Sequence, residues 1–294
     1  MLSREQLVQL LGDAMQTPPK LIKKEILFTE SYILERFVLQ LNEEELVPAY
    51  FAYPIGAKQC PLVLYNHSHG GDFTKGKEEL LSSSNYLQEE SFLDVLIAAG
   101  YAVGAIDMWA FGERQQNERS LFKRFLLEGK TLWGQRIFDN QQFLTYLLTR
   151  DEVDTQRIAT IGMSMGGMMS WWLAAVDERV KIVVDLAGQV DYGALIAEKK
   201  LDKHGEYYFL PGFLKQATTL EVQQLIAPRP RLSIVGNSDT LCPQSGVNQL
   251  NQALCQYYSE LGASNCWQSE IVTGGHEETR EMRWLWQSYL NKKL

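Results

Sequence analysis

Three features of the sequence predict an α/β fold built on a mostly parallel, eight-stranded sheet. Short, continuous apolar runs alternate with helical patterns through most of the chain, and that alternation is typical of right-handed βαβ units. The apolar runs lack the polar alternation of half-exposed strands, so we expect helices on both faces of the sheet. Ahead of them, two partly alternating runs flank an acidic turn, which predicts an N-terminal antiparallel hairpin.

Composition excludes several classes of protein. The chain has 294 residues, of which 45% are hydrophobic, and this is too apolar for a disordered chain. Its 36 Asp and Glu residues outnumber 28 Lys and Arg residues, so the net charge of −8 disfavours nucleic acid and anionic membranes as partners. No signal peptide and no membrane-spanning run of about 18 apolar residues is indicated. We therefore expect a cytoplasmic protein.

The N-terminal segment, residues 1–30, is expected to be a helical extension. An amphipathic pattern over residues 2–15 predicts a helix, and the two prolines that follow it end the pattern. The hairpin comes next, with strands over residues 31–41 and 46–53 joined by the acidic turn.

The remaining chain alternates between strands and helices in what we expect to be a single domain over residues 1–294. Six further strands are expected at 61–65, 102–106, 157–161, 180–184, 232–235 and 270–272. Helical patterns cover residues 92–99, 133–148, 165–175, 244–261 and 277–290. Two long polar stretches, 72–91 and 189–216, interrupt the alternation, and each is either a lid or cap insertion or a plain surface loop.

The strongest local signal is a G-x-S-x-G motif at residues 162–166. It follows an apolar strand and opens an apolar helix, which is the context that a nucleophile elbow requires. A serine on so sharp a turn takes a strained backbone, so the residues two before and two after it must lack side chains, as Gly162 and Gly166 do. The turn would project the hydroxyl of Ser164 above the carboxyl edge of the sheet, which predicts Ser164 as a nucleophile.

A serine nucleophile needs a base, and histidine is the best base near neutral pH. The chain offers only His67, His69, His204 and His276. In hydrolases with this elbow the base comes after the acid in the chain. That order favours His276, which lies in a glycine-containing loop between the last strand and the last helix. His204 lies in a polar stretch and is expected at the solvated surface.

The acid of the predicted triad should follow a strand between Ser164 and His276. Asp239 fits best, because it turns off the end of an apolar strand and could hold the imidazole in the required tautomer. Asp185 and Asp191 are rivals, since both follow the preceding strand. Asp185 sits inside an apolar run, which favours a structural role.

Acyl transfer also needs donors for the oxyanion, and backbone N–H groups commonly supply them. We expect one from Met165, at the start of the helix, and one from His69, in a glycine-rich loop after a strand. The side chains of His67 and His69 are expected to hold this loop by hydrogen bonds. A metal site at these two histidines is the alternative, but no third ligand is evident and the four cysteines form no C-x-x-C pair. We expect no metal and no other cofactor.

Together these residues resemble the α/β-hydrolase superfamily, and more narrowly the dienelactone-hydrolase-like esterases and the catalytic domains of prolyl-oligopeptidase-type peptidases. The resemblance spans roughly residue 46 to the C-terminus, and residues 107–114 resemble a loop that borders the pocket in this group. The other matching residues are the loop 67–71, Asp154 with Arg157, the elbow 162–167, the segment 227–230, Asp239 and His276. Dienelactone hydrolases proper use a cysteine nucleophile where this chain has Ser164, and the peptidases carry a propeller domain for which this chain has no room.

The ordered triad and the resemblance imply a serine hydrolase, first of all a carboxylesterase that forms an acyl-enzyme on Ser164. Its partner would be a small- to medium-sized ester. The aromatic side chains of Trp109, Tyr207, Tyr208 and Phe209 are candidates to line the substrate pocket, although they could equally belong to the core.

Two other functions stay open at this point. A small aminopeptidase or amidase would use the same triad, and Glu113 or Asp72 could then hold the amino terminus of the substrate. A binding protein that keeps the fold without turnover is the third possibility, and a broken triad would point to it.

Overall fold

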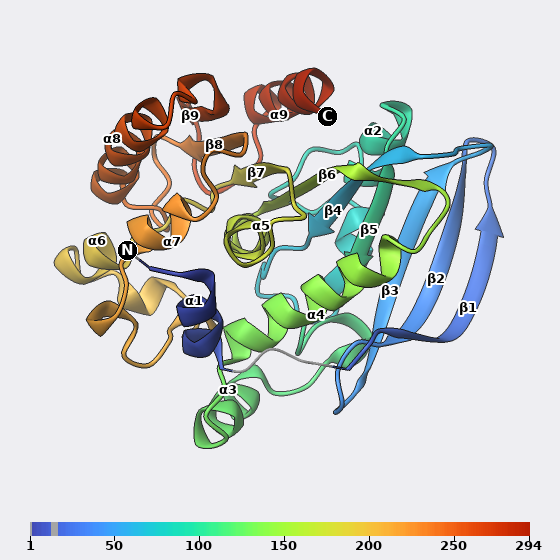
Figure 1. The fold of residues 1–294 in the computed structure, drawn as a ribbon, viewed down its shortest axis with the longest axis horizontal. Helices are drawn as coiled ribbons and strands as arrows, with labels where there is room; N and C mark the ends of the chain where they lie inside the picture. The colour runs from blue at the N-terminus through green and yellow to red at the C-terminus, as the bar shows by residue number, and fades with distance from the viewer. Residues whose placement is uncertain (1, 13–16) are drawn as a thin grey trace.

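The computed structural model describes residues 2–12 and 17–294. Among these residues one sheet has nine strands (Figure 1). In chain order they are β1 (Lys20–Phe28), β2 (Tyr32–Gln40), β3 (Leu46–Pro54), β4 (Cys60–Asn66), β5 (Ala102–Ile106), β6 (Val153–Met163), β7 (Ile182–Leu186), β8 (Arg231–Gly236) and β9 (Trp267–Val272). Their spatial order is β1-β2-β3-β5-β4-β6-β7-β8-β9. β4 to β9 run parallel, and the first three strands are antiparallel. The predicted fold class is confirmed, but the sheet has nine strands where eight were predicted.

The additional strand is β1, at the edge of the sheet. Its side chains are exposed almost throughout, and its register with β2 shifts between Leu21 and Lys23. An edge strand without a buried face shows no alternation of apolar and polar residues, so its sequence carries no strand signal. The prediction of a helical extension is therefore wrong for residues 20–28. It holds for α1 (Arg4–Leu11), and residues 13–15 of the predicted helix lie outside the described residues.

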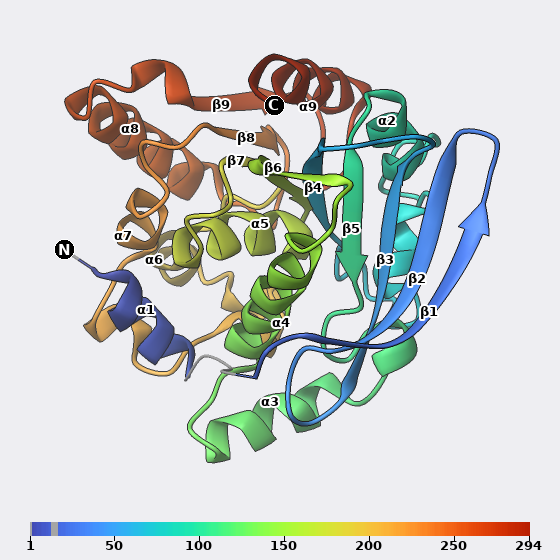
Figure 2. The same cartoon turned by 45° about the vertical axis from the view of Figure 1, so that its right-hand side comes forward.

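Helices cover both faces of the sheet, as predicted. On one face α4 (Leu132–Leu147) and α5 (Met165–Val176) pack together with α1 over one apolar core. On the other face α2 (Phe92–Ala98) and α9 (Arg280–Lys293) pack over a second core (Figure 2). All twelve residues of α5 are buried, so the helix that follows Ser164 lies in the centre of its layer.

The two polar stretches contain short helical pieces instead of long helices. Residues 72–91 include the 3-10 helix η1 (Gly76–Leu80), and residues 189–216 include α6 (Tyr192–Ala197) and the 3-10 helix η4 (Glu206–Tyr208). The described residues form three further α-helices: α3 (Glu118–Leu127), α7 (Thr219–Gln224) and α8 (Gln244–Glu260). In the part of the chain that the structure describes, no helix has the length and apolar character needed to cross a membrane.

The carboxyl ends of the parallel strands bring distant residues to one edge of the sheet. β4 leads into the loop with His67 and His69, and β6 leads directly into Ser164. Asp239 follows β8, and His276 follows β9. In open α/β sheets, ligands bind at this edge, so the topology places the candidate residues where a site is expected.

The rival acid Asp185 lies inside the sheet, where hydrogen bonds and an ion pair hold its carboxylate. Its Oδ2 accepts from Nε of Arg231 at 2.9 Å, and its Oδ1 accepts from the hydroxyl of Ser233 at 2.7 Å. Both members of the ion pair are buried, with side-chain exposures of 1% for Arg231 and 0% for Asp185. The second rival, Asp191, caps the N-terminus of α6. Both rivals are thus occupied by structural roles, as the apolar run around Asp185 indicated for that residue.

Replacing Asp185 by Asn would leave the guanidinium of Arg231 buried without a counter-charge. We therefore expect Asp185→Asn to lower the free energy of unfolding by about 3 kcal/mol, measured by urea denaturation. The matched control is Glu206→Gln, which removes the charge from an exposed pair with Arg119 and should cost less than about 1 kcal/mol. Equal losses in the two variants would contradict a structural role for Asp185.

Candidate active site

Ser164 forms the turn between β6 and α5 in a backbone conformation that few residues adopt. Its φ is 57° and its ψ is −120°, outside the regions that an L-residue ordinarily occupies. The turn is crowded, because a Cβ on Gly162 or Gly166 would collide with the carbonyl oxygen of Asn66 at the end of β4. The N–H of Ser164 donates to the carbonyl of Leu186 at 2.8 Å. Space therefore requires glycine at both flanking positions.

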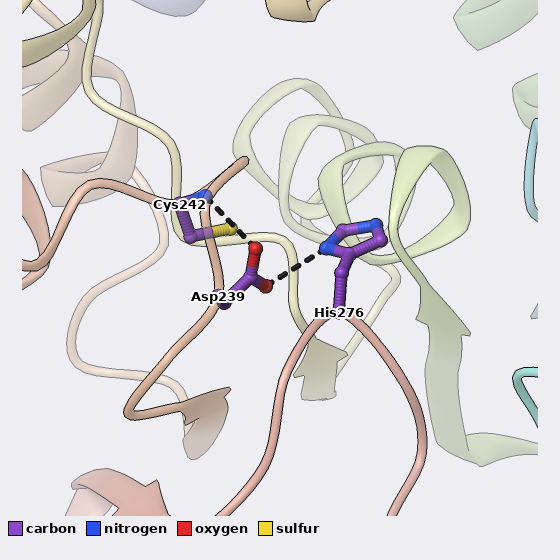
Figure 3. A group of neighbouring side chains, drawn as sticks. All are labelled: Asp239, Cys242 and His276. Carbon is purple, nitrogen blue, oxygen red and sulfur yellow. Dashed lines mark hydrogen bonds and ion pairs between the residues drawn. The ribbon is translucent and has the colours of Figure 1, made fainter.

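Three side chains from separate elements meet above this turn. Nε2 of His276 lies 2.7 Å from Oγ of Ser164, and Nδ1 of His276 lies 2.8 Å from Oδ2 of Asp239. Figure 3 shows the imidazole and the carboxylate facing each other from two loops. Because a carboxylate only accepts hydrogen bonds, Nδ1 carries the proton and Nε2 is free to accept from the Ser164 hydroxyl. The structure thus brings together the three residues that the sequence predicted as nucleophile, base and acid.

The carboxylate of Asp239 is held in its ionised form. Its Oδ1 accepts from the N–H groups of Leu241 at 2.8 Å and Cys242 at 3.2 Å. Burial alone raises the pKa of Asp239, but the hydrogen bond and charge of His276 and these two N–H donors outweigh burial. The net pKa therefore lies below its usual value. Asp239 can consequently orient His276 and stabilise its protonated form over the whole neutral range.

The thiol of Cys242 lies beside this pair, so the three residues are a candidate metal site. One ligand atom each of Asp239, Cys242 and His276 lies within 4.8 Å of the others (Figure 3). The carboxylate of Asp239 and the imidazole of His276 already form a hydrogen bond with each other. The thiol of Cys242 donates a hydrogen bond to the carbonyl of Ala187 at 3.3 Å. Burial raises the pKa of Cys242 well above its usual value, whereas metals bind the thiolate. The chemistry of this donor set therefore fits a carboxylate that orients the imidazole better than it fits a metal site.

The predicted oxyanion donors lie on the two segments that flank Ser164. Met165 is the first residue of α5, so its N–H has no acceptor within the helix. In the loop after β4, the N–H of Ser68 donates to the carboxylate of Glu79 at 2.7 Å. The next N–H along that loop belongs to His69, and both Ser68 and His69 border the same cavity as Ser164.

His67 holds the loop by hydrogen bonds, as its position predicted, and does not reach the cavity. Its Nδ1 lies 2.9 Å from the carbonyl of Ser68, and its Nε2 accepts from the N–H of Met108 at 3.1 Å. Burial is the main cause that lowers the pKa of His67 to about 4, so the ring is neutral. Both ring nitrogens are occupied, and a metal site shared by His67 and His69 is therefore not supported.

A cavity of about 400 Å³ opens beside Ser164 and His276. Its walls are largely apolar, with Met163, Met168, Ala187, Val190 and Leu241 among the lining residues. Its polar lining includes His69, Tyr86, Lys203 and His204. Residues from both polar stretches, 72–91 and 189–216, thus border the cavity. Its volume lies in the range of small-molecule sites, about 300–1,000 Å³.

Only one of the four aromatic residues predicted to bind substrate lines this cavity. Tyr207 does so. Trp109 is buried in the core, where its ring packs edge-to-face with that of Phe125, with the ring centres 5.2 Å apart. Tyr208 is fully buried, and Phe209 borders a separate apolar groove. The prediction is therefore wrong for Trp109, Tyr208 and Phe209. Tyr207 and Tyr208 are consecutive residues of the 3-10 helix η4, and consecutive residues of such a turn point in different directions. Trp109 comes from another segment and packs in the core.

The expectation that His204 lies at the solvated surface is also wrong. Its Nε2 lies 2.8 Å from the carbonyl of Leu241, and the ring lines the cavity close to His276. Burial lowers the pKa of His204 below its usual value. The surrounding polar sequence suggested a surface position, and no local pattern signalled that the stretch folds back over the site. Tyr86 was missed for the same reason.

Comparison with known proteins assigns the chain to a family. A sequence model of the dienelactone hydrolase family matches residues 88–262, more than half of the chain. The chain belongs to the dienelactone hydrolase family. The matched range includes Ser164 and Asp239, whereas His276 lies beyond its end. YtaP of Bacillus subtilis (strain 168), which is named as a hydrolase, is 44% identical over 294 residues, with 99% of this chain and 98% of YtaP covered.

Solved structures of esterases share the fold of this dienelactone hydrolase family member. A glucuronoyl esterase from Solibacter usitatus superposes with a TM-score of 0.71 at 14% identity, covering 99% of this chain and 92% of that one. Acetyl xylan esterase 1 from Thermoanaerobacterium sp. JW/SL YS485 gives a TM-score of 0.64 at 18% identity, with 98% and 93% covered. At these identities the likeness establishes the α/β-hydrolase fold.

The neutral, buried His67 makes the stability of the protein depend on pH. Its folded pKa of about 4 lies below the ordinary histidine value of 6.5, so its contribution is fully present above pH 6.5 and is lost as the pH falls towards 4. Between pH 7 and pH 5 we expect wild type to lose about 2 kcal/mol more unfolding free energy than His67→Gln. Urea denaturation at both pH values measures the difference. The same loss in both proteins would contradict a buried, neutral His67.

Proposed function

We propose that this member of the dienelactone hydrolase family is a serine carboxylesterase. The observation that carries the proposal is the continuous chain of hydrogen bonds from Ser164 through His276 to Asp239, with distances of 2.7 Å and 2.8 Å. A serine hydroxyl becomes a useful nucleophile only when a base takes its proton, and this geometry supplies the base and the group that orients it. The strained elbow presents the hydroxyl to the cavity.

The proposed reaction has two halves. Nε2 of His276 takes the proton of Ser164 as its Oγ attacks the ester carbonyl, and the N–H groups of Met165 and His69 stabilise the oxyanion. The imidazolium then gives the proton to the leaving alcohol, and an acyl-enzyme on Ser164 remains. In the second half His276 activates water, which releases the acid. The ionised Asp239 stabilises the imidazolium in both halves.

The cavity favours an ester of small to medium size. Its volume of about 400 Å³ and its largely apolar lining suit a short acyl or alcohol group. Esterase activity is also consistent with the names of the structural neighbours, an acetyl xylan esterase and a glucuronoyl esterase. We propose that residues 72–91 and 189–216 act as cap insertions of a single domain over residues 1–294. The cytoplasmic location stays a prediction of the sequence.

An exopeptidase function fits the site less well. A carboxylate would be needed to bind the amino terminus of a peptide, but none of the described residues that line the cavity is Asp or Glu. Glu113 is paired with Lys77 at 2.6 Å, and Asp72 accepts from Thr74; neither candidate lines the cavity. A binding role without turnover does not require the hydrogen-bonded arrangement of Ser164, His276 and Asp239, so this arrangement favours an enzyme.

Substitution of the three residues tests the proposed roles. We expect Ser164→Ala to abolish both labelling by a fluorophosphonate and hydrolysis of p-nitrophenyl acetate. His276→Ala should lower kcat by at least about 10⁴-fold, and Asp239→Asn by about 10³- to 10⁴-fold because the tautomer of His276 is then wrong.

The matched control for this series is Ser238→Ala, which changes an exposed serine beside Asp239 whose hydroxyl donates to the carbonyl of Gly274. This variant should keep the label and most of the activity. A wild-type protein that takes no label and hydrolyses no p-nitrophenyl ester would refute the proposal.

A substrate panel separates the esterase from the aminopeptidase. We expect turnover of p-nitrophenyl esters with short acyl chains, decreasing as the chain outgrows the cavity of about 400 Å³. Aminoacyl-naphthylamides should be cleaved at least about 100-fold more slowly, because the described lining offers no carboxylate for an ammonium group. The reverse preference would favour the aminopeptidase.

A further inference from the structure

One ion pair, with Arg136 buried and Glu118 partly buried, connects the side chains of both residues proposed to donate to the oxyanion. Oε1 of Glu118, at the start of α3, accepts from Nη2 of Arg136, on α4, at 2.6 Å. At one end of the pair, Oε2 of Glu118 lies 3.2 Å from Nε2 of His69. At the other end, Nη1 of Arg136 lies 3.4 Å from Sδ of Met165. Two helices, the loop after β4 and the start of α5 are thereby joined through four side chains.

Aromatic rings pack against the guanidinium of this ion pair. The guanidinium carbon of Arg136 lies 4.7 Å from the ring centre of Tyr207 and 5.1 Å from that of Phe111. The imidazole of His69 stacks on the ring of Tyr207, with the centres 5.3 Å apart and an angle of 14°. Arg136 is completely buried, and its Nε and Nη2 donate to the carbonyl of Trp109. Electrostatic contacts in such surroundings are strong and geometrically defined.

The protonation states of the partners agree with this arrangement. The N–H of Gly71 donates to Nδ1 of His69 at 3.2 Å, so the ring proton lies on Nε2 and is donated to Glu118. Burial opposes ionisation of Glu118, but the bonds and charges of His69 and Arg136 prevail and lower the pKa of its carboxyl to about 2. Arg136 and His69 therefore each donate to a different oxygen of the Glu118 carboxylate.

We propose that Glu118 is a positioning residue that sets the separation of the two oxyanion donors. It touches neither Ser164 nor the cavity, and it acts through His69 on one side and through Arg136 and Met165 on the other. Stabilisation of an oxyanion requires both N–H groups at hydrogen-bond distance from the position where the charge develops. A shift of the loop relative to α5 would lengthen one of these bonds. This inference rests on the proposed esterase function.

The test compares Glu118→Gln with a matched variant, Glu128→Gln, at the exposed C-terminal end of the same helix. Glutamine keeps the volume but has a single oxygen, so it can satisfy His69 or Arg136 but not both. We expect kcat for p-nitrophenyl acetate, per titrated active site, to fall at least about tenfold in Glu118→Gln, with KM within about twofold. Glu128→Gln should match wild type.

A second readout separates positioning from a general effect on folding. A trifluoromethyl ketone forms a tetrahedral adduct with Ser164 that carries an oxyanion, so its inhibition constant should rise by the same factor as kcat/KM falls. A smaller fraction of titratable sites with unchanged kcat and unchanged inhibition per site would overturn the proposal, because the ion pair would then stabilise only the fold.

A third variant keeps the proposal testable if Glu118→Gln does not fold. His69→Ala retains the backbone N–H but removes the link to Glu118, and it should show the same paired losses in kcat and inhibitor affinity. Wild-type values in a folded His69→Ala would overturn the proposal. Failure of the esterase assignment has a different signature, since wild type itself would then neither hydrolyse the ester nor react with a fluorophosphonate.

Discussion

Close approach of two backbone segments holds the whole site together. The elbow around Ser164 presses against the carbonyl of Asn66 through Gly162 and Gly166, where a Cβ would collide. The side chain of Asn66 reinforces this contact by donating to the hydroxyl of Ser170 on α5 at 2.9 Å. Because Asn66 ends β4, the same contact brings the loop with His69, the second proposed oxyanion donor, next to Ser164. One steric constraint thus sets the relative positions of Ser164 and this loop.

Buried carboxylates anchor the loops that surround the site. Glu79 accepts from the N–H of Ser68 at 2.7 Å and from the hydroxyl of Tyr86 at 2.6 Å, so it ties the stretch 72–91 to the loop after β4. Lys77, in the same stretch, is buried and lies 2.8 Å from the carboxylate of Asp107. Some of the acidic residues therefore hold loops in place from inside the molecule. Loops held by such bonds lose little further freedom when a substrate binds, which favours preorganised electrostatic stabilisation.

Where the chemistry constrains the residue type or the chain order, the sequence identified residues that the structure brings together. The elbow needs glycine on both sides of Ser164, only four histidines were available, and the order of the triad selected Asp239 and His276. Prediction from the sequence failed where the direction of a side chain decides whether it faces the cavity or the core. Tyr207 lines the cavity whereas its neighbour Tyr208 is buried in the core, and both residues have the same local sequence properties. The edge strand β1 was missed because it has no buried face.

The sequence by itself determined the fold class, the glycine-flanked turn at Ser164 and the candidate residues for base and acid, because strand periodicity and turn sterics are local properties. Only the tertiary structure decided which aromatic rings face the cavity, how the two polar stretches fold back over it, and that His204 borders it. It alone also revealed the ion pair of Glu118 and Arg136. These features depend on contacts between residues far apart in the chain, for which neither spacing nor composition carries a signal.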